Sequence, residues 1–198
     1  MGYTSETIHR VEHIISTHGI RTVVDLGAQN NYSQPHLPAP YMSEWYLNRN
    51  IDYVAIDING ENGSLPLNLA MPLPDDIGQF DMLVDAGTSE HVGVDGAFSK
   101  WAIFQCWKNK HELVKPGGFM ICENPKTGNW PGHGFNYYTE EFYTRLAKYC
   151  NYEILELGQH PAMGNVTDGW NIHCIIRKRE DNLFMSIGDF EKCEIQTK

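Results

Sequence analysis

Short apolar runs rich in β-branched residues recur along this chain, and segments of helical periodicity separate them. The first run covers residues 22–26 and ends at Gly27. Such runs are typical of buried parallel strands, because helices cover both faces of a parallel sheet. By the same criteria, further strands are expected at 51–57, 64–69, 80–85, 119–123, 153–157 and 171–176.

The segments between these runs carry the start and stop signals of helices. One helix is expected at 5–18, with Ser5 as its N-cap and Gly19 as its stop signal. Others are expected late in 29–50, from about 96 to 114, and from the N-cap Thr139 to about 149. Strands that alternate with helices predict an α/β fold, a doubly wound, mostly parallel seven-stranded sheet with helices on both faces. The final two strands have no crossover helix between them, which predicts an antiparallel last strand.

The length and composition fit one globular domain. The chain has 198 residues, of which 41% are hydrophobic and 20% are charged, and this differs from the composition of disordered segments. We therefore expect a single domain over 1–198, with its core at about 20–178, an N-terminal helix within 1–19 and a tail at 180–198.

The charge balance bears on the partners. The formal net charge of −10 disfavours nucleic acid, because a phosphate backbone would be repelled. No window approaches the roughly 20 apolar residues of a membrane span, and no secretion signal is recognisable, so a cytoplasmic protein without membrane contact is expected. The five cysteines form no CxxC pair, which predicts reduced thiols. The oligomeric state stays open.

The residues that follow each strand are the candidates for a binding site. In a doubly wound sheet, ligands bind at the carboxyl ends of the strands. Asp25, Gly27 and Ala28 lie at the end of the first strand, and Asp57 ends the second. A small residue lets the backbone approach a ligand, and a carboxylate can accept hydrogen bonds from both hydroxyls of a ribose. The alternative for either carboxylate is the capping of a loop.

Four motifs in one order carry a resemblance to a known family. They are Val-Val-Asp-Leu-Gly at 23–27, Ala-Ile-Asp at 55–57, Phe-Asp-Met-Leu-Val-Asp at 80–85 with Glu-His-Val at 90–92, and Leu-Val-Lys-Pro-Gly-Gly-Phe at 113–119. Together they resemble the class I S-adenosylmethionine (SAM)-dependent methyltransferases, over roughly residues 20–178.

The resemblance implies SAM as the cofactor and S-adenosylhomocysteine as its product. It places Asp25 near the amino group of the cofactor and Asp57 on the ribose. The segment that follows residue 85 would border the sulfonium and the acceptor pocket. The cofactor-binding residues expected on this basis are Asp25, Gly27, Ala28, Gln29, Asp57, Ile58, Asn68, Leu69, Asp85, Ala86 and Gly87.

The glycine turn departs from the family pattern. The family commonly has Gly-x-Gly-x-Gly, whereas residues 27–31 read Gly-Ala-Gln-Asn-Asn. Asn tolerates the left-handed conformation, so the turn can form without the later glycines. A nicotinamide-dependent dehydrogenase would not explain the segment at 113–119, and the family's DNA amino-methyltransferases carry a Pro-Pro motif where this chain has Asp85-Ala86-Gly87.

Two histidines are the candidate catalytic residues. Methyl transfer to a hydroxyl or a protonated amine releases a proton, which a nearby base can accept. His133 lies in a glycine-rich, aromatic segment at 123–138 that we interpret as the acceptor loop, and His91 follows the strand at 80–85. A surface position for His133 and a structural role for His91 are the alternatives. Trp130, Tyr137 and Tyr138 could line an acceptor pocket or pack the following helix, and the same choice applies to Tyr41, Trp45 and Tyr46 as a lid.

The sequence thus predicts a SAM-dependent methyltransferase that modifies an oxygen or nitrogen atom of a small-molecule acceptor. No metal ion is expected, because Asp85 lacks a cluster of acidic partners and the closest histidine pair, His9 and His13, suits a solvated helix face. A macromolecular acceptor and a non-catalytic binding or scaffold protein of the same fold stay open as alternatives.

Overall fold

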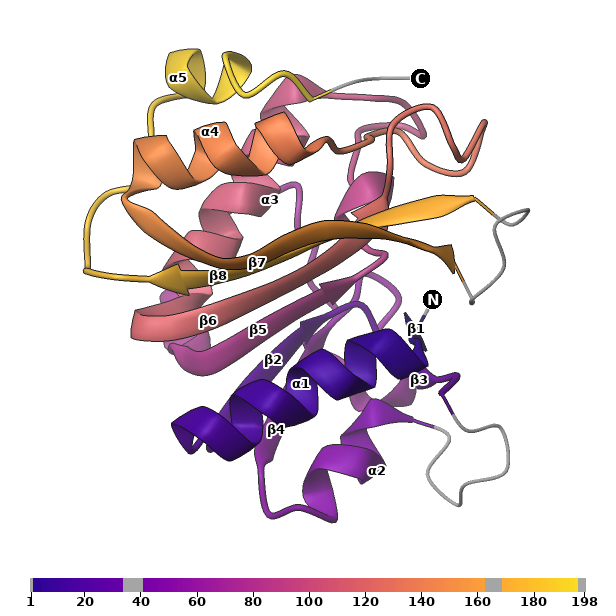
Figure 1. The fold of residues 1–198 in the computed structure, drawn as a ribbon, viewed down its shortest axis with the longest axis vertical. Helices are drawn as coiled ribbons and strands as arrows, with labels where there is room; N and C mark the ends of the chain where they lie inside the picture. The colour runs from indigo at the N-terminus through magenta and orange to yellow at the C-terminus, as the bar shows by residue number, and fades with distance from the viewer. Residues whose placement is uncertain (1, 34–40, 163–168, 196–198) are drawn as a thin grey trace.

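A computed structural model describes residues 2–33, 41–162 and 169–195, and its centre is a six-stranded sheet with the order β4-β2-β5-β6-β8-β7 (Figure 1). Four neighbouring strands are parallel, and β8 is antiparallel to both β6 and β7. The strands are β2 (Thr22–Leu26), β4 (Asp52–Ile56), β5 (Phe80–Ala86), β6 (Val114–Pro125), β7 (Tyr152–Pro161) and β8 (Trp170–Lys178). The antiparallel last strand is confirmed, and it lies inside the sheet with β7 at the edge.

The expected seventh strand at 64–69 does not form, which corrects the seven-stranded sheet. Only Leu65 pairs with β4, through a single parallel bridge to Ile56. The next N–H on the sheet side, that of Leu67, donates to the Leu65 carbonyl at 2.8 Å and not to β4, so the pairing stops there. A separate two-stranded parallel sheet joins β1 (Gly2–Tyr3) to β3 (Asn30–Asn31).

Helices cover both faces of the sheet, as expected (Figure 1). One face carries α1 (Ser5–His18) and α2 (Met42–Leu47); the other carries α3 (Lys100–Leu113), α4 (Glu140–Cys150) and α5 (Ile187–Glu191). Single 3₁₀ turns lie at Glu61–Gly63, Asp75–Ile77 and Ser89–His91. No helix in the described part of the chain is long and apolar enough to cross a membrane.

The helix caps confirm most of the predicted boundaries. Gly19 ends α1 in the left-handed conformation, and Thr139 caps α4 by accepting the Phe142 N–H. The N-cap of α1 is Thr4 and not the expected Ser5. The third helix begins later than expected, after the N-cap Ser99, because residues 94 and 97 first pair in a tight turn.

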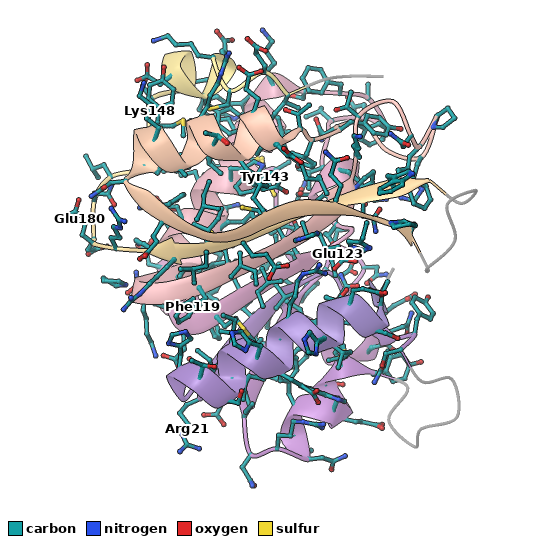
Figure 2. All side chains as sticks on the ribbon, viewed as in Figure 1. Arg21, Phe119, Glu123, Tyr143, Lys148 and Glu180 are labelled. Atoms are coloured by element: carbon teal, nitrogen blue, oxygen red, sulfur yellow. The ribbon has the colours of Figure 1, made fainter. Side chains whose placement is uncertain are left out.

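Alternate residues of each strand fill two separate cores. Val23 of β2 faces α1 and α2, whereas its neighbour Val24 faces α3 and α4. Figure 2 shows the same division, with Phe119 on the side of α1 and Tyr143 on α4. This two-sided burial explains why the strands are continuously apolar, and it leaves their carboxyl ends as the edge where polar side chains gather.

Candidate functional site

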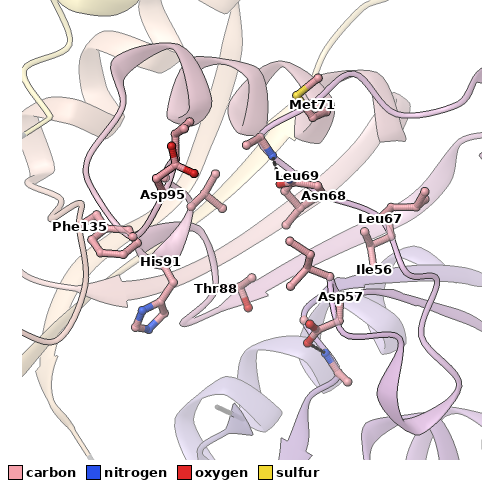
Figure 3. A pocket seen from close by; sticks show the side chains of 18 of the residues that line it. Ile56, Asp57, Leu67, Asn68, Leu69, Met71, Thr88, His91, Asp95 and Phe135 are labelled. Carbon is pink, nitrogen blue, oxygen red and sulfur yellow. Dashed lines mark hydrogen bonds between the residues drawn. The ribbon is translucent and has the colours of Figure 1, made fainter.

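A cavity of about 560 Å³ lies at the carboxyl ends of β2, β4 and β5 (Figure 3). In this view Asp57 and His91 lie at opposite sides, with Thr88 between them. Most of the expected cofactor-binding residues line this cavity, namely Gly27, Ala28, Gln29, Asp57, Ile58, Asn68 and Leu69. The volume is within the range of about 300–1,000 Å³ that small-molecule and cofactor sites occupy.

The glycine turn is closed by side chains that the sequence analysis did not assign to it. Gly27 has φ +81°, and a Cβ atom there would lie 2.6 Å from Thr88 Oγ1. Gln29 Nε2 donates hydrogen bonds to the Leu26 carbonyl at 2.6 Å and to Thr88 Oγ1 at 3.0 Å. These bonds fold the Gln29 side chain over the turn, at the position where the family commonly has a second glycine. Gln29 Oε1 is buried and has no hydrogen-bond partner among the described residues.

Asp57 and Asn68 fix the backbone of the cavity wall that faces the glycine turn. Asp57 Oδ2 accepts the Ala28 N–H at 2.9 Å, which joins the end of β4 to the turn after β2. Asn68 Oδ1 accepts the Ala70 N–H at 2.9 Å. The Asn109 side chain of α3 donates to the carbonyls of Leu69 and Met71, at 3.0 and 2.9 Å. The loop that lines the cavity is therefore anchored to the helix beneath it.

Asp25 lies beneath the turn and does not line the described cavity. Its side chain is fully buried, and its two carboxylate oxygens accept hydrogen bonds from Tyr3 at 2.5 Å and from Tyr53 at 2.9 Å. Burial raises the pKa of Asp25 to about 8, although the two tyrosine hydrogen bonds act in the opposite direction. The structure thus gives this carboxyl group a supporting position beneath the turn.

Asp85 also supports the site from below. It is fully buried and forms an ion pair of 2.8 Å with Lys110 of α3, whose side chain is fully buried as well. Burial acts to raise the pKa of Asp85, but the Lys110 ammonium and the hydrogen bonds from Ser89 together outweigh it and lower that pKa. Asp85 Oδ1 accepts the backbone N–H groups of Thr88 and Ser89, each at 3.1 Å. The carboxylate therefore fixes the loop that follows β5.

Sequence reasoning missed Lys110, although a signal for it exists. Lys110 follows Ile103, Cys106 and Trp107 at the helical spacing of the buried face of α3, where a charged residue requires a partner. Its ammonium also lies 3.3 Å from the centre of the Trp107 ring.

A second, smaller cavity of about 180 Å³ lies on the other side of the loop that follows β5. Ala86 and Gly87 line this cavity, not the larger one, together with Glu90, Trp130 and His133. Thr88 and His91 line the larger cavity. Residues 86–91 therefore separate the two cavities.

The expected catalytic histidines meet at this boundary. Oε1 of the fully buried Glu90 lies 3.6 Å from His91 Nε2 and 3.7 Å from His133 Nε2, and the two imidazole rings are 4.9 Å apart. Burial lowers the pKa of His91 despite the neighbouring Glu90. Both histidines were predicted as catalytic residues, whereas the buried carboxylate that lies between them was not predicted.

The aromatic residues of the acceptor loop divide between the cavity and the core. Trp130 lines the second cavity, and its Nε1 donates to the Trp170 carbonyl at 2.9 Å. Tyr138 is fully buried in the core, and the Tyr137 hydroxyl accepts the His133 and Gly134 N–H groups.

The aromatic residues of the expected lid pack against the sheet. Trp45 and Tyr46 are buried, and the Tyr46 ring stacks on Tyr53 at 5.1 Å. His36, which the same segment contains, lies outside the described residues.

A charged cluster in the wall of the second cavity was not expected. Glu123 lies near the end of β6 with a nearly fully buried side chain, which accepts a hydrogen bond from the Thr7 hydroxyl at 2.8 Å. Arg10 and His160 lie 3.5 and 3.2 Å from its carboxylate. Burial acts to raise the pKa of Glu123, but these neighbours lower it, and the carboxylate in turn raises the pKa of His160.

The fold is that of the class I SAM-dependent methyltransferases. The chain is similar to the N-methyltransferase NodS of Bradyrhizobium japonicum WM9 in complex with S-adenosylhomocysteine, with 12% identity, a TM-score of 0.60 and coverage of 89% of each chain. It is also similar to the 1,6-didemethyltoxoflavin N1-methyltransferase of Burkholderia thailandensis, with 13% identity, a TM-score of 0.58 and coverage of 85% of this chain and 76% of that one. A SAM-dependent methyltransferase from Archaeoglobus fulgidus is similar at 12% identity and a TM-score of 0.56, covering 88% of this chain and 95% of that one. No protein-family model and no curated protein sequence matches the chain.

Proposed function

We propose that this protein is a methyltransferase that transfers the methyl group of SAM to an oxygen or nitrogen atom of a small-molecule acceptor. The observation that carries the proposal is the pair of cavities on either side of residues 86–91, with the Gly27 turn and Asp57 in the larger one and two histidines at the boundary.

The larger cavity has the chemistry that SAM requires. Asp57 offers a carboxylate to the ribose hydroxyls, and Gln29 Oε1 is a buried acceptor without a partner in the described part of the chain, suited to the amino group of the cofactor. Ile56, Leu67 and Leu69 offer apolar surface for the adenine. The Gly27 backbone leaves room because no Cβ atom fits there.

SAM supplies a methyl group on a positively charged sulfur that is already activated for displacement. The residues of the chain therefore have to orient the acceptor and exclude water. As the new bond to the methyl carbon forms, the bond from that carbon to sulfur breaks, and a hydroxyl or ammonium acceptor loses its proton. We assign this proton removal to the cluster of His91 and His133, which lies at the boundary of the two cavities.

A small acceptor is favoured by the size of the second cavity, about 180 Å³, and by the net charge of −10. The Burkholderia thailandensis neighbour supports the same class, because its structure holds 1,6-didemethyltoxoflavin, a small molecule, beside S-adenosylhomocysteine. A non-catalytic scaffold would have no need for the bond between Asp57 and the Ala28 turn that shapes the cavity, nor for the buried acceptor on Gln29.

Calorimetric titration with SAM and with S-adenosylhomocysteine tests the proposal. Charge-assisted hydrogen bonds contribute about 1.5–3 kcal/mol each, so Asp57→Ala should weaken binding roughly 10- to 100-fold or more. Asp52→Ala is the matched control, because Asp52 is exposed at the opposite end of the same strand. Absence of binding by the wild-type protein, or equal affinities for the wild type and Asp57→Ala, would refute the assignment of this cavity.

A further inference from the structure

Three potential metal ligands converge at the boundary between the two cavities. The ligand atoms of Glu90, His91 and His133 all lie within 4.8 Å of one another. With metal–ligand bonds of about 2.0–2.2 Å, neighbouring ligands of one ion lie roughly 3–3.5 Å apart, close to the measured 3.6 and 3.7 Å from Glu90 Oε1 to the two Nε2 atoms. Both imidazoles are partly exposed, so small rotations bring the three donors to bonding distance. We propose that Glu90, His91 and His133 bind one divalent transition-metal ion.

The charge of Glu90 supports a cation at this position. Glu90 is fully buried, and Oε1 has no hydrogen-bond partner among the described residues. Within the described ranges, Oε2 accepts only a long hydrogen bond, 3.4 Å, from Asn124 Nδ2. The nearby Lys110 ammonium is engaged with Asp85. Because a buried carboxylate without a compensating charge is costly, a cation between Oε1 and the two imidazoles would neutralise the site.

The two segments that carry the ligands are held together by backbone bonds. The Phe135 and Asn136 N–H groups both donate to the Glu90 carbonyl, at 2.7 and 3.1 Å. Asn136 Nδ2 donates to the Val92 carbonyl at 2.9 Å. A Cβ atom on Gly134 would lie 2.8 Å from the Glu90 carbonyl oxygen, so this close approach requires glycine. The ligands are thus presented by a rigid frame, as a metal site requires.

The ligand set selects the class of ion. Two imidazole nitrogens and one carboxylate oxygen suit Zn²⁺, Co²⁺ or Fe²⁺, whereas Mg²⁺ and Ca²⁺ prefer oxygen ligands alone. Three protein ligands also leave one coordination position for a further molecule, which is the pattern of catalytic rather than structural zinc sites. No metal was expected from the sequence, because Asp85 lacks acidic partners and the histidines show no ligand spacing, whereas the fold brings Glu90, His91 and His133 together.

The role of the ion rests on the proposed function, although its binding does not. Glu90 and His133 line the second cavity, so the open position lies where the acceptor is expected. An acceptor hydroxyl bound to the ion loses its proton to solvent more readily, since a metal ion can lower the pKa of bound water from 15.7 to about 7. The oxygen lone pair then forms the bond to the methyl carbon as the carbon–sulfur bond breaks. Both Nε2 atoms bind the ion in this arrangement and are not free to accept a proton. The ion, and not the histidines, then promotes the loss of the acceptor proton.

The test is a titration of chelator-treated protein with CoCl₂, followed by visible absorption, and with ZnCl₂, followed by calorimetry. We expect one ion per chain, and a loss of affinity above about 100-fold in Glu90→Gln and in His133→Asn, since even outer partners of metal ligands contribute 10- to 100-fold. The matched control is a His9→Ala/His13→Ala double variant, which removes the exposed histidine pair on α1. Circular dichroism and binding of S-adenosylhomocysteine verify that each variant is folded.

Three outcomes overturn the metal site: no binding of either ion, equal affinity in the wild type and both ligand variants, or loss of binding in the His9→Ala/His13→Ala control alone. If a ligand variant fails to fold, the test is made on the wild-type protein alone. A bound ion must then raise the thermal unfolding midpoint of the wild type, and bound Co²⁺ must show the visible absorption bands of a four- or five-coordinate ion. The two proposals fail separately. Normal S-adenosylhomocysteine affinity without metal binding removes only the metal site, and metal binding without S-adenosylhomocysteine affinity removes only the proposed function.

Discussion

The protonation of Asp25 should make the stability of this protein depend on pH. The Asp25 carboxyl group is fully buried, and its pKa rises from 3.8 to about 8 in the folded state. The folded protein therefore holds this proton more tightly than the unfolded chain does. This tighter proton binding contributes to the free energy of unfolding. The contribution is fully present below pH 3.8 and is lost as the pH rises towards 8.

The size of this effect follows from the shift. Each pKa unit corresponds to about 1.36 kcal/mol, so a rise of about 4 units amounts to roughly 5–6 kcal/mol as an upper limit. Asp25→Asn removes the ionisation while its amide can still pair with Tyr3 and Tyr53, at a cost of about 1 kcal/mol for the altered hydrogen bonds. The unfolding free energy of Asp25→Asn minus that of the wild type should therefore increase by about 4 kcal/mol between pH 5 and pH 8.

Urea unfolding of the wild type and Asp25→Asn at several pH values from 5 to 8.5 measures this difference. Asp52→Asn is the control, because the exposed Asp52 side chain should show no such growth. A wild-type protein that is more stable than Asp25→Asn at pH 8 would refute the reasoning, since it would mean that the two tyrosine hydroxyls stabilise an ionised carboxylate. Asp25→Asn should also keep the wild-type affinity for S-adenosylhomocysteine, because Asp25 does not line the described cavity.

Three further substitutions test the support of the site. Lys110→Met leaves the Asp85 carboxylate buried without its cation and should lower the unfolding free energy by about 3–5 kcal/mol. The double variant Lys110→Met/Asp85→Asn should lose less unfolding free energy than the sum of the two single variants. Urea titrations measure both quantities. Gly27→Ala places a Cβ atom 2.6 Å from Thr88 Oγ1 on a backbone with φ +81°, so it should weaken S-adenosylhomocysteine binding at least about tenfold. An unchanged affinity by calorimetry would contradict this, because it would mean that the turn accommodates the extra atom. Thr139→Ala removes the N-cap of α4 and should lower the unfolding free energy by about 1 kcal/mol, with ligand affinity unchanged because that helix does not line the larger cavity.

Local patterns were enough to predict most of the fold. The strand at 22–26 was predicted with its observed bounds, because a β-branched run ending in glycine has few alternatives. The strand at 64–69 was wrong for an equally local reason. The Leu67 N–H, which the second pair would need, donates to the Leu65 carbonyl, and apolar periodicity does not indicate such a tight turn.

The candidate site was predicted in part, and the division has a physical cause. Gly27 and Asp57 follow from the rule that ligands bind at the carboxyl ends of parallel strands, whereas Leu69 was expected from the family resemblance, and all three line the described cavity. Contacts between distant segments were not predictable in this way. The ion-pair partner of Asp85 is 25 residues away on a helix, and one of the two hydrogen-bond partners of Asp25 is Tyr3, 22 residues before it.

The loop that follows β5 unites these separate observations. Its first turn is fixed by Asp85, which the buried Lys110 neutralises, and its Thr88 side chain closes the glycine turn through the Leu26 carbonyl. Two residues further on, Glu90 receives the backbone of the acceptor loop. One short segment therefore contacts the glycine turn on one side and the segment 123–138 on the other. Among the residues that the structure describes, the carboxylate at that junction has no hydrogen-bond partner on Oε1. A ligand in the site explains this better than folding alone, because a neutral side chain would serve a structural role at lower cost.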